Sequence, residues 1–351
     1  MNVAPKIEIC GRKIGEDFEP FVIAEVSANH NGSLDQALAI MEASSDAGAH
    51  AVKLQTYTPD TITLNHDGPG FKIDGSLWNG ESLYSLYERA HTPWDWHSAL
   101  FEKGRELGLI VFSSPFDSTA VQFLEELDAP AYKIASFELV DLPLIRLCAS
   151  TGKPLIMSTG MASLAEIGEA VETAKNAGAE QIALLHCTSG YPTPPDDADL
   201  RTIPHLAQAF GRTVGLSDHT PGAGAPIAAV ALGASIIEKH VTMCREDGGP
   251  DSEFSLEPRE LKTLCEGVEL AWRALGGVRY DRADSEVANV QFRRSLYVTS
   301  DVVAGEKLGP ENVRSIRPGY GLPPKMYDIV LGKAVNRDIA RGTPLSWDMI
   351  G

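Results

Sequence analysis

The sequence lacks the features that mark secreted or membrane-spanning proteins. Its five cysteines are scattered and form no CxxC pair, so reduced thiols are expected rather than a disulfide framework. The first ten residues, MNVAPKIEIC, lack the basic and then apolar pattern of a signal segment. The longest apolar run, residues 225–237, is too short to cross a bilayer. These absences predict a soluble, cytoplasmic protein.

Positive charge is also scarce. The 351 residues include 30 Lys and Arg against 48 Asp and Glu, which gives a formal net charge of −18. A general binder of nucleic acid or of anionic membranes is therefore not expected, because no basic excess exists to neutralise phosphates. A small anionic substrate is still compatible with this charge. Hydrophobic content of 43% and charged content of 22% are typical of a globular protein with one large domain and a smaller one.

No GxGxxG motif follows the first apolar run, which disfavours a doubly wound open sheet with a dinucleotide site. What the chain has instead is an apolar strand followed by a helical pattern, repeated eight times over about 250 residues, the usual size of a (β/α)₈ TIM barrel. Helical patterns such as 34–48 and 164–178 end at glycine, where helices commonly stop. The predicted strands are 21–29, 51–57, 109–116, 131–136, 154–160, 182–189, 213–220 and 235–241.

Each predicted strand begins apolar and becomes polar towards its carboxyl end. In SIIEKHV (235–241), the ionisable residues Glu238, Lys239 and His240 interrupt the apolar run, which is costly unless they meet partners, water or a metal. A single polar strand end could simply precede a loop. Eight of them in a barrel would meet at one mouth, where barrel enzymes place their active sites. The pattern therefore predicts one shared site.

Two histidines end consecutive predicted strands. His219 in LSDHT and His240 in EKHV could together bind one metal ion, because neighbouring parallel strands lie about 4.8 Å apart. Water and substrate would complete the coordination of such an open site. Either histidine could instead be a hydrogen-bonded core residue. Glu238 shares a strand face with His240 and is predicted to accept its ring proton, while Lys239 is predicted on the opposite face.

Two lysines lie inside apolar strands, Lys53 in VKLQ and Lys133 in YKIAS. A buried ammonium group must find an anion. The lysines are predicted to form a pocket for a phosphate and a carboxylate, together with the hydroxyl groups of Ser114, Ser136, Ser158 and Ser217. Two alternatives are an internal ion pair with Glu25 or Glu138 and a lysine Schiff base, as in some aldolases.

Several longer motifs resemble the sialic acid synthase family. They are EVSANHNGSLDQALAIMEASSDAGAHAVKLQTY, SSPFD, YKIAS, STGM, HCTSGYPTP, GLSDHT, EKHVT and GPDSEFS. The likeness runs from about residue 20 to the C-terminus, and segment 75–97 particularly resembles the branch that makes pseudaminic acid. Ser189-Gly190 stand where many neuraminate-forming relatives carry an asparagine and a larger residue. This departure favours a sugar other than N-acetylmannosamine.

The resemblance implies a metal-dependent condensation of phosphoenolpyruvate with 2,4-diacetamido-2,4,6-trideoxy-L-altrose, giving a nonulosonic acid and phosphate. Synthesis of N-acetylneuraminate or legionaminate is the alternative within the family. The implied metal is Mn²⁺ or Mg²⁺ on His219 and His240. The residues implied to bind phosphoenolpyruvate are Lys53, Ser114, Lys133, Ser136, Ser158 and Ser217.

The acceptor sugar is implied to contact Glu25, Gln55, Tyr191 and Asp251. Lys53 and Lys133 are predicted to hold the reactant anions in productive geometry, and Glu25 and Glu138 are candidates for moving protons or placing water. The sequence leaves those last two roles unassigned.

The predicted domains are a catalytic barrel at 1–275, a linker at 276–292 and a small β-rich domain at 293–351 that resembles the antifreeze-like (SAF) domain of the same family. An internal repeat aligns 301–313 with 338–350, which indicates approximate internal symmetry. Taken alone, this domain would also fit a non-catalytic carbohydrate- or surface-binding protein. In the family, an arginine at the position of Arg317 contacts the sugar in the partner subunit, which implies a domain-swapped homodimer.

Overall fold

The computed structural model describes residues 6–74 and 78–351 and divides the chain into two compact units, Met1–Gly276 and Gly277–Gly351. Each unit has its own hydrophobic core.

The first unit is a closed barrel of eight parallel strands in the order β10-β3-β4-β5-β6-β7-β8-β9. This confirms the predicted (β/α)₈ fold. Each observed strand lies within a predicted run but is shorter, because the last residues of each run begin the following loop. The strands are β3 (Phe21–Glu25), β4 (Ala51–Thr56), β5 (Ile110–Pro115), β6 (Tyr132–Ile134), β7 (Leu155–Ser158), β8 (Ile182–Cys187), β9 (Thr213–Asp218) and β10 (Ile236–His240).

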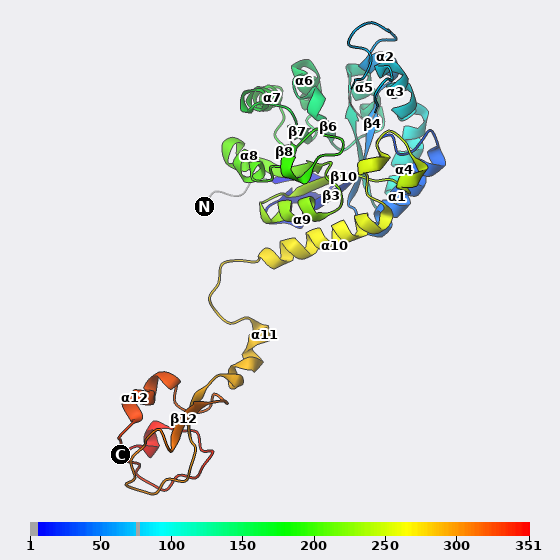
Figure 1. The fold of residues 1–351 in the computed structure, drawn as a ribbon. Coiled ribbons are helices and arrows are strands. Elements are labelled where there is room, and N and C mark those ends of the chain that lie inside the picture. The colour runs from blue at the N-terminus through cyan, green and yellow to red at the C-terminus, as the bar shows by residue number, and fades with distance from the viewer. Residues whose placement is uncertain (1–5, 75–77) are drawn as a thin grey trace. The chain divides into compact units, whose positions relative to one another are not determined.

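Helices alternate with these strands and cover the outside of the barrel (Figure 1). The first of them begins at the N-cap Ser33, whose side chain accepts from the amide of Gln36, and ends at Gly48 with φ of 92°. That left-handed conformation is the one in which glycine avoids the Cβ penalty. The outer helices are α1 (Leu34–Ala47), α4 (His97–Leu107), α5 (Ser118–Glu126), α6 (Leu142–Ser150), α7 (Leu164–Asn176), α8 (Thr202–Phe210), α9 (Gly224–Ala231) and α10 (Pro258–Leu275).

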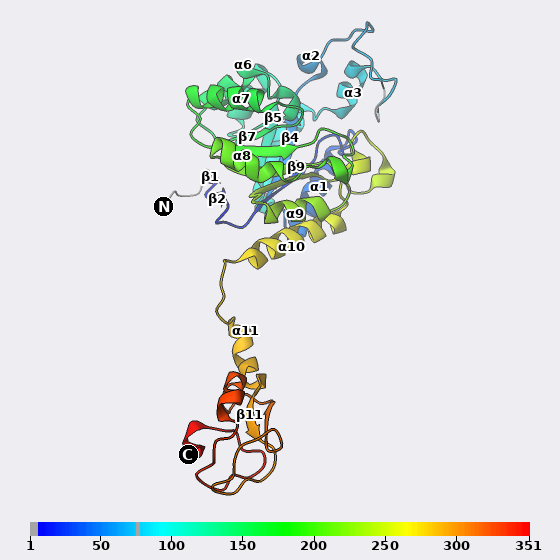
Figure 2. The ribbon, with the colours of Figure 1, turned by 60° about the vertical axis from the view of Figure 1, so that its left-hand side comes forward.

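An N-terminal hairpin of β1 (Lys6–Ile9) and β2 (Arg12–Gly15) precedes the barrel (Figure 2). Its side chains Ile7, Ile9 and Ile14 belong to the same buried cluster as barrel residues such as Phe21 and Phe112. The interior of the barrel next to the hairpin is therefore a packed core rather than a pore.

The connection between β4 and α4 is long and contains two extra helices, α2 (Pro59–Ile62) and α3 (Leu83–Ala90). Figure 1 shows this connection rising above the barrel, in blue and cyan. Residues 75–77, at the start of the segment that carries the pseudaminic resemblance, lie outside the described residues.

The second unit contains α11 (Asp284–Val287), the antiparallel pair β11 (Ser295–Val298) and β12 (Val313–Ile316), and α12 (Tyr327–Val330). The two copies of its internal repeat, 301–313 and 338–350, pair with each other symmetrically. Val302 and Ile339 exchange backbone hydrogen bonds of 2.9 and 2.8 Å. The side chain of Asp301 accepts from the amide of Arg341, and that of Asp338 accepts from the amide of Ala304. The two copies of the repeat thus stabilise each other in the same way.

Candidate active site

A cavity of about 640 Å³ opens at the carboxyl ends of the barrel strands. It brings together twelve of the fourteen predicted site residues, which come from positions scattered between 25 and 251. The polar residues that line it are Glu25, Ser27, Lys53, Gln55, Lys133, Ser136, Glu138, Ser158, Cys187, Ser189, Tyr191, Ser217, His219, Glu238, His240 and Asp251.

Two predicted residues do not line the cavity. Ser114 is fully buried, and its hydroxyl lies 3.4 Å from Nζ of Lys53, so it contacts that lysine without lining the cavity itself. Arg317 belongs to the second unit, where it follows β12 and is exposed. No ion pair or hydrogen bond of its side chain is found among the described residues. Its turn is held by the hydroxyl of Ser295, which donates to Pro318 O at 2.7 Å, and by the amide of Gly319, which donates to Gln291 O.

Two lysines and two glutamates form a buried charged cluster on the inner wall. Nζ of Lys53 lies 2.8 Å from Oε2 of Glu25 and 3.7 Å from Oε1 of Glu238. Nζ of Lys133 lies 3.5 Å from the same Glu238 oxygen and donates to Ser158 Oγ at 2.7 Å. The ion pair with Glu25, one alternative from the sequence, is therefore present, and the lysines share Glu238 as well.

Burial and charge compete in setting the pKa values of this cluster. Burial alone would raise the pKa of Glu238, but Lys133 and Lys53 hold it below its ordinary value. Burial lowers the pKa of Lys133, and Glu238 opposes that effect only in part. Burial raises the pKa of Glu138 to about 7. The cluster can therefore stabilise an incoming anion, and Glu138 can hold or release a proton near neutral pH.

The two histidines face each other across neighbouring strands, with ring centroids 5.3 Å apart. Nδ1 of His219 lies 3.0 Å from the carbonyl oxygen of Thr188, to which it donates, so that in the neutral imidazole Nε2 carries the lone pair. Burial lowers the pKa of His219, but its contacts with Cys187 and Thr188 outweigh burial and raise it, so a metal at Nε2 must displace a proton. Nδ1 of His240 is buried, has no hydrogen-bond partner among the described residues and lies 3.9 Å from Oδ2 of Asp251. Burial and the charge of nearby groups lower the pKa of His240, which favours the neutral imidazole that metals require.

These donors fit a divalent metal in an open site. Within the described part of the chain, no group of three or more His, Cys, Asp or Glu residues is arranged to hold an ion. Two imidazoles would leave the remaining positions to water and substrate, as in catalytic rather than structural sites.

The predicted role of Glu238 as the partner of His240 is wrong. The two side chains share the inner face, but residues two apart in a strand are separated by about 6.6 Å. The carboxylate of Glu238 therefore lies at the level of Lys53, Lys133 and Ser217, whose hydroxyl donates to it at 3.1 Å. The acid beside His240 is Asp251.

Lys239 takes the opposite face, as the strand period requires. It is fully buried and donates to Oδ2 of Asp218 at 2.5 Å and to the carbonyl oxygen of Thr220. Three other polar residues near strand ends also have structural contacts. Asn29 donates to Val241 O and Ser255 Oγ, Ser113 bonds to Thr56, and His186 bonds to Ala198 O.

A third group of side chains lines the cavity beside the two histidines. Oγ of Ser27 donates to Asp251 and accepts from Gln55, whose amide also donates to Glu25. The ring of Tyr191 lies 4.4 Å from that of His219. Ser27 was not predicted, although its spacing of two from Glu25 is a signal for the same face. These groups can hydrogen-bond to a polyol.

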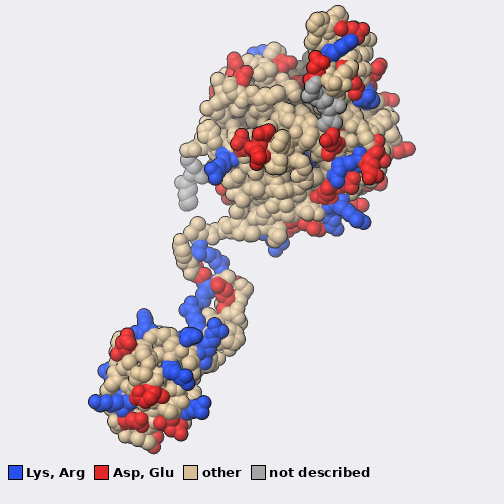
Figure 3. All heavy atoms as spheres, viewed as in Figure 1, with Lys and Arg blue, Asp and Glu red and all other residues tan. Residues whose placement is uncertain are grey.

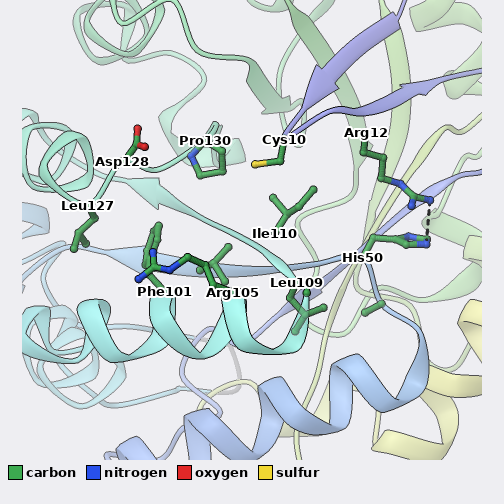
Figure 4. A pocket seen from close by; sticks show the side chains of 13 residues that line it. Cys10, Arg12, His50, Phe101, Arg105, Leu109, Ile110, Leu127, Asp128 and Pro130 are labelled. Atoms are coloured by element: carbon green, nitrogen blue, oxygen red, sulfur yellow. Dashed lines mark hydrogen bonds between the residues drawn. The ribbon is translucent and has the colours of Figure 1, made fainter.

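A second cavity, of about 580 Å³, lies at the other end of the barrel, beside the residues that precede β4, β5 and β6 (Figure 4). Arg12 and His50 lie on one side of it, and Arg12 is already paired with Glu19 at 3.3 Å. Its remaining walls are mainly apolar, and no cluster of charges converges there comparable to the one around Lys53.

Figure 3 shows acidic side chains interspersed with basic ones on the visible face of the barrel unit. The positive charge of the site is therefore internal, since Lys53 and Lys133 are buried. Among the described residues, no helix has both the length and the apolar character needed to cross a membrane.

The NeuB family model matches residues 40–280, and the SAF domain model matches residues 293–351. The chain belongs to the NeuB family. It is 46% identical over 329 residues to the pseudaminic acid synthase of Campylobacter jejuni, a match that covers 94% of this chain and 96% of the relative. It is 34% identical over 341 residues to the N,N'-diacetyllegionaminic acid synthase of Legionella pneumophila, covering 96% of each.

Among solved structures, the N-acetylneuraminic acid synthetase of Leptospira borgpetersenii in complex with citrate superposes with a TM-score of 0.73. It is 32% identical, and the match covers 82% of this chain and 95% of that one. The protein is accordingly an enzyme of the nonulosonic acid synthase class.

Proposed function

We propose that the protein is a pseudaminic acid synthase that condenses phosphoenolpyruvate with 2,4-diacetamido-2,4,6-trideoxy-L-altrose. The observation that carries the proposal is the convergence of two buried lysines and two facing imidazoles in one cavity. Among the two relatives named above, the identity of 46% to a pseudaminic acid synthase against 34% to a legionaminic acid synthase supports the choice of sugar.

In the proposed reaction, C3 of phosphoenolpyruvate attacks the aldehyde carbon of the open-chain sugar, and water adds at C2. The tetrahedral species then loses phosphate and becomes the 2-keto acid. Lys53 and Lys133 bind the phosphate and the carboxylate, aided by the hydroxyl groups of Ser136, Ser158 and Ser217. Because these side chains are packed and hydrogen-bonded before the substrate arrives, little reorganisation is needed at the moment of reaction.

His219 and His240 would hold Mn²⁺ or Mg²⁺, which when bound supplies Lewis-acid polarisation of the aldehyde oxygen. Asp251, Gln55 and Tyr191 orient the sugar hydroxyl and acetamido groups. Burial raises the pKa of Glu25, so this carboxyl can carry a proton beside Lys53. Glu25 and Glu138 are the two candidates for delivering a proton to the sugar oxygen and for placing the water.

The second unit contributes Arg317 to this proposal. Its side chain is exposed and its turn is held by hydrogen bonds, so it is suited to reach a ligand outside its own unit. We propose that it contacts the sugar in the barrel of a second subunit, in a domain-swapped homodimer.

The test is incubation with phosphoenolpyruvate, Mn²⁺ or Mg²⁺ and a panel of acetamido sugars, with phosphate release as the measurement. The proposal expects a clear preference for the diacetamido-trideoxyaltrose. A preference for N-acetylmannosamine or for the diacetamido-mannose isomer would instead identify a neuraminate or legionaminate synthase. Absence of phosphate release with every sugar would reject catalysis and favour a carbohydrate-binding protein.

A further inference from the structure

One side of the active-site cavity is apolar and comes almost entirely from the long connection between β4 and α4. We call its residues the apolar wall. They are Tyr57, Ile62, Ile73, Trp78, Leu83, Leu86, Tyr87 and Ala90. None of the eight is charged, whereas the lysines of the cavity come from the barrel strands. The polar atoms of these eight side chains are the hydroxyl groups of Tyr57 and Tyr87 and the indole N–H of Trp78, so a fully hydroxylated ligand would find fewer hydrogen-bond partners here than beside the lysines and glutamates.

The wall lies next to the reacting groups. The indole Nε1 of Trp78 donates to the carbonyl oxygen of Pro250 at 3.0 Å, and the following residue, Asp251, is the acid beside His240. The ring of Trp78 also lies 5.9 Å from that of Tyr191, which in turn contacts His219. An acceptor whose aldehyde is at the two histidines would therefore extend its far end onto the wall.

The wall is packed rather than loose. Tyr57 is almost fully buried, and its ring makes edge contacts with Tyr87 at 5.7 Å and with Phe116 at 5.1 Å. Leu86 is buried beneath them. Arg89, in the last turn of α3, forms an ion pair of 3.0 Å with Glu81, which lies just before this helix. Such a surface keeps its shape and can select ligands by shape and polarity.

We propose that the apolar wall determines which acceptor sugar is used, by binding the methyl groups at its far end. A 6-deoxy sugar with two acetamido groups presents methyl groups there, whereas N-acetylmannosamine presents a hydroxymethyl group and a free hydroxyl. This inference rests on the proposed function and adds to it the residues that select the substrate. An apolar pocket discriminates against one added hydroxyl or missing methylene by about tenfold to 200-fold, which is the range expected here.

The experiment replaces half-buried wall residues, whose change should leave the fold intact. The variants Leu83→Gln and Ile73→Gln place an amide where a methyl group would bind. Leu83→Met is the conservative control, because volume is nearly conserved. Leu64→Gln is the matched control, since Leu64 lies in the same connection, is 64% exposed and does not line the cavity. Circular dichroism and thermal unfolding confirm that each variant is folded.

The measurement is kcat/KM for the diacetamido-trideoxyaltrose and for N-acetylmannosamine, with the KM for phosphoenolpyruvate recorded in parallel. In the two glutamine variants of the wall, the ratio of the two kcat/KM values should fall at least tenfold through a higher KM for the deoxy sugar. The KM for phosphoenolpyruvate should not change. Leu83→Met and Leu64→Gln should keep the wild-type ratio. An unchanged ratio in both wall variants overturns the proposal.

A second measurement separates this inference from the proposed reaction. Saturation-transfer NMR of the deoxy sugar, recorded with phosphoenolpyruvate and EDTA, reports which protons lie against the protein. The C6 methyl group and the methyl of the C4 acetamido group should receive the strongest saturation, and Leu83→Gln should weaken it. That result supports the wall even if wild-type protein releases no phosphate with any sugar, in which case the reaction alone is rejected. Equal saturation of all sugar protons would contradict the proposal that the apolar wall binds the methyl groups.

Discussion

At the residue scale, Glu238 holds the two lysines that are proposed to bind phosphoenolpyruvate. One of its oxygens lies 3.7 Å from Nζ of Lys53 and 3.5 Å from Nζ of Lys133. A phosphate group entering the cavity must compete with this carboxylate for both ammonium groups. The empty site is thereby stabilised, at the cost of weaker anion binding.

Glu238→Gln should show both effects. The ligand-free variant should unfold more easily, by about 3 kcal/mol, because two buried lysines lose a shared partner. Inorganic phosphate should raise its melting temperature more than it raises that of the wild type. Differential scanning fluorimetry with increasing phosphate measures both quantities. Equal phosphate-induced shifts in the two proteins would show that Glu238 does not compete with the anion.

Glu138 provides a prediction about pH. Burial raises its pKa to about 7, well above the value of an unfolded glutamate, and within the part of the chain that the structure describes Oε2 has no hydrogen-bond partner. The folded state therefore binds a proton that the unfolded state has already lost, so stability falls as pH rises from about 4.5 to about 7.

The comparison with Glu138→Gln isolates that effect. Between pH 5 and pH 8, the free energy of unfolding of the wild type should fall by about 2 kcal/mol relative to the variant. Urea unfolding of both proteins at several pH values tests this. Parallel stability curves would mean that Glu138 ionises normally in the folded protein.

The sequence predicted the positions of some site residues and not of others. Lys53 and Lys133 stood out because a charge in an apolar run needs a partner, and both lie in the cavity. The position of Glu238 was not readable, because strand alternation gives the face of a side chain and not its level along the barrel axis. Ser114 shows the same limit, since its hydroxyl contacts Lys53 but does not line the cavity.

At the element scale, the metal-binding candidates stand at the ends of β9 and β10, with His219 directly after β9 and His240 as the last residue of β10. The two strands are joined on their outer face by a buried ion pair. Lys239 contacts Asp218, and the side chain of Asp218 also accepts from the amide and hydroxyl of Thr220. His219 and His240 are the immediate neighbours of these residues. The pair therefore fixes the two strand ends from which the imidazoles project.

Lys239→Met should leave Asp218 buried without its counter-charge. The expected loss of stability is about 3–5 kcal/mol, and Asp218→Asn in the same chain should restore part of it by removing the unpaired charge. Calorimetric titration with Mn²⁺ should also show weaker binding to Lys239→Met at a temperature where it is folded. Wild-type Mn²⁺ affinity in that variant would show that the outer pair stabilises the barrel without orienting the histidines.

Elements were predicted better than their ends. The repeated apolar run followed by a helical pattern was enough for the barrel, because that alternation has few packing solutions. Asn29 and His186 lie near strand ends, where the sequence pattern predicts residues of the mouth, yet both bond to backbone or side-chain partners in loops. The apolar wall was not predicted at all, since Leu83 and Ile73 look like ordinary hydrophobic residues until the fold brings them to the cavity.

At the scale of the whole molecule, the two units divide the proposed chemistry between them. The barrel contains the buried charges and the histidines, and the second unit supplies only Arg317. The repeat that pairs Val302 with Ile339 gives this small unit a self-contained core, so it can hold one arginine on a hydrogen-bonded turn. The proposed domain-swapped dimer requires that Arg317 acts in the barrel of a partner subunit and not in the barrel of its own chain.

Mixing two inactive variants resolves this question. In Lys133→Met the barrel site is defective, and in Arg317→Ala the second unit is defective, so each protein alone should have little activity. If Arg317 acts in a partner subunit, a mixed dimer contains one site in which both groups are intact. Random mixing should then restore about a quarter of wild-type phosphate release, because half of the dimers are mixed and half of their sites are complete.

If Arg317 acts within its own chain, no subunit of the mixture has both groups, and activity stays at the level of the single variants. Co-expression with two different affinity tags, followed by purification on both, enriches the mixed dimer and should double the restored activity. Arg317→Lys mixed with Lys133→Met tests the chemistry further. Lysine keeps the charge but not the two-pronged geometry of the guanidinium group, so it should restore less activity than arginine wherever a planar, bidentate contact to the sugar is made.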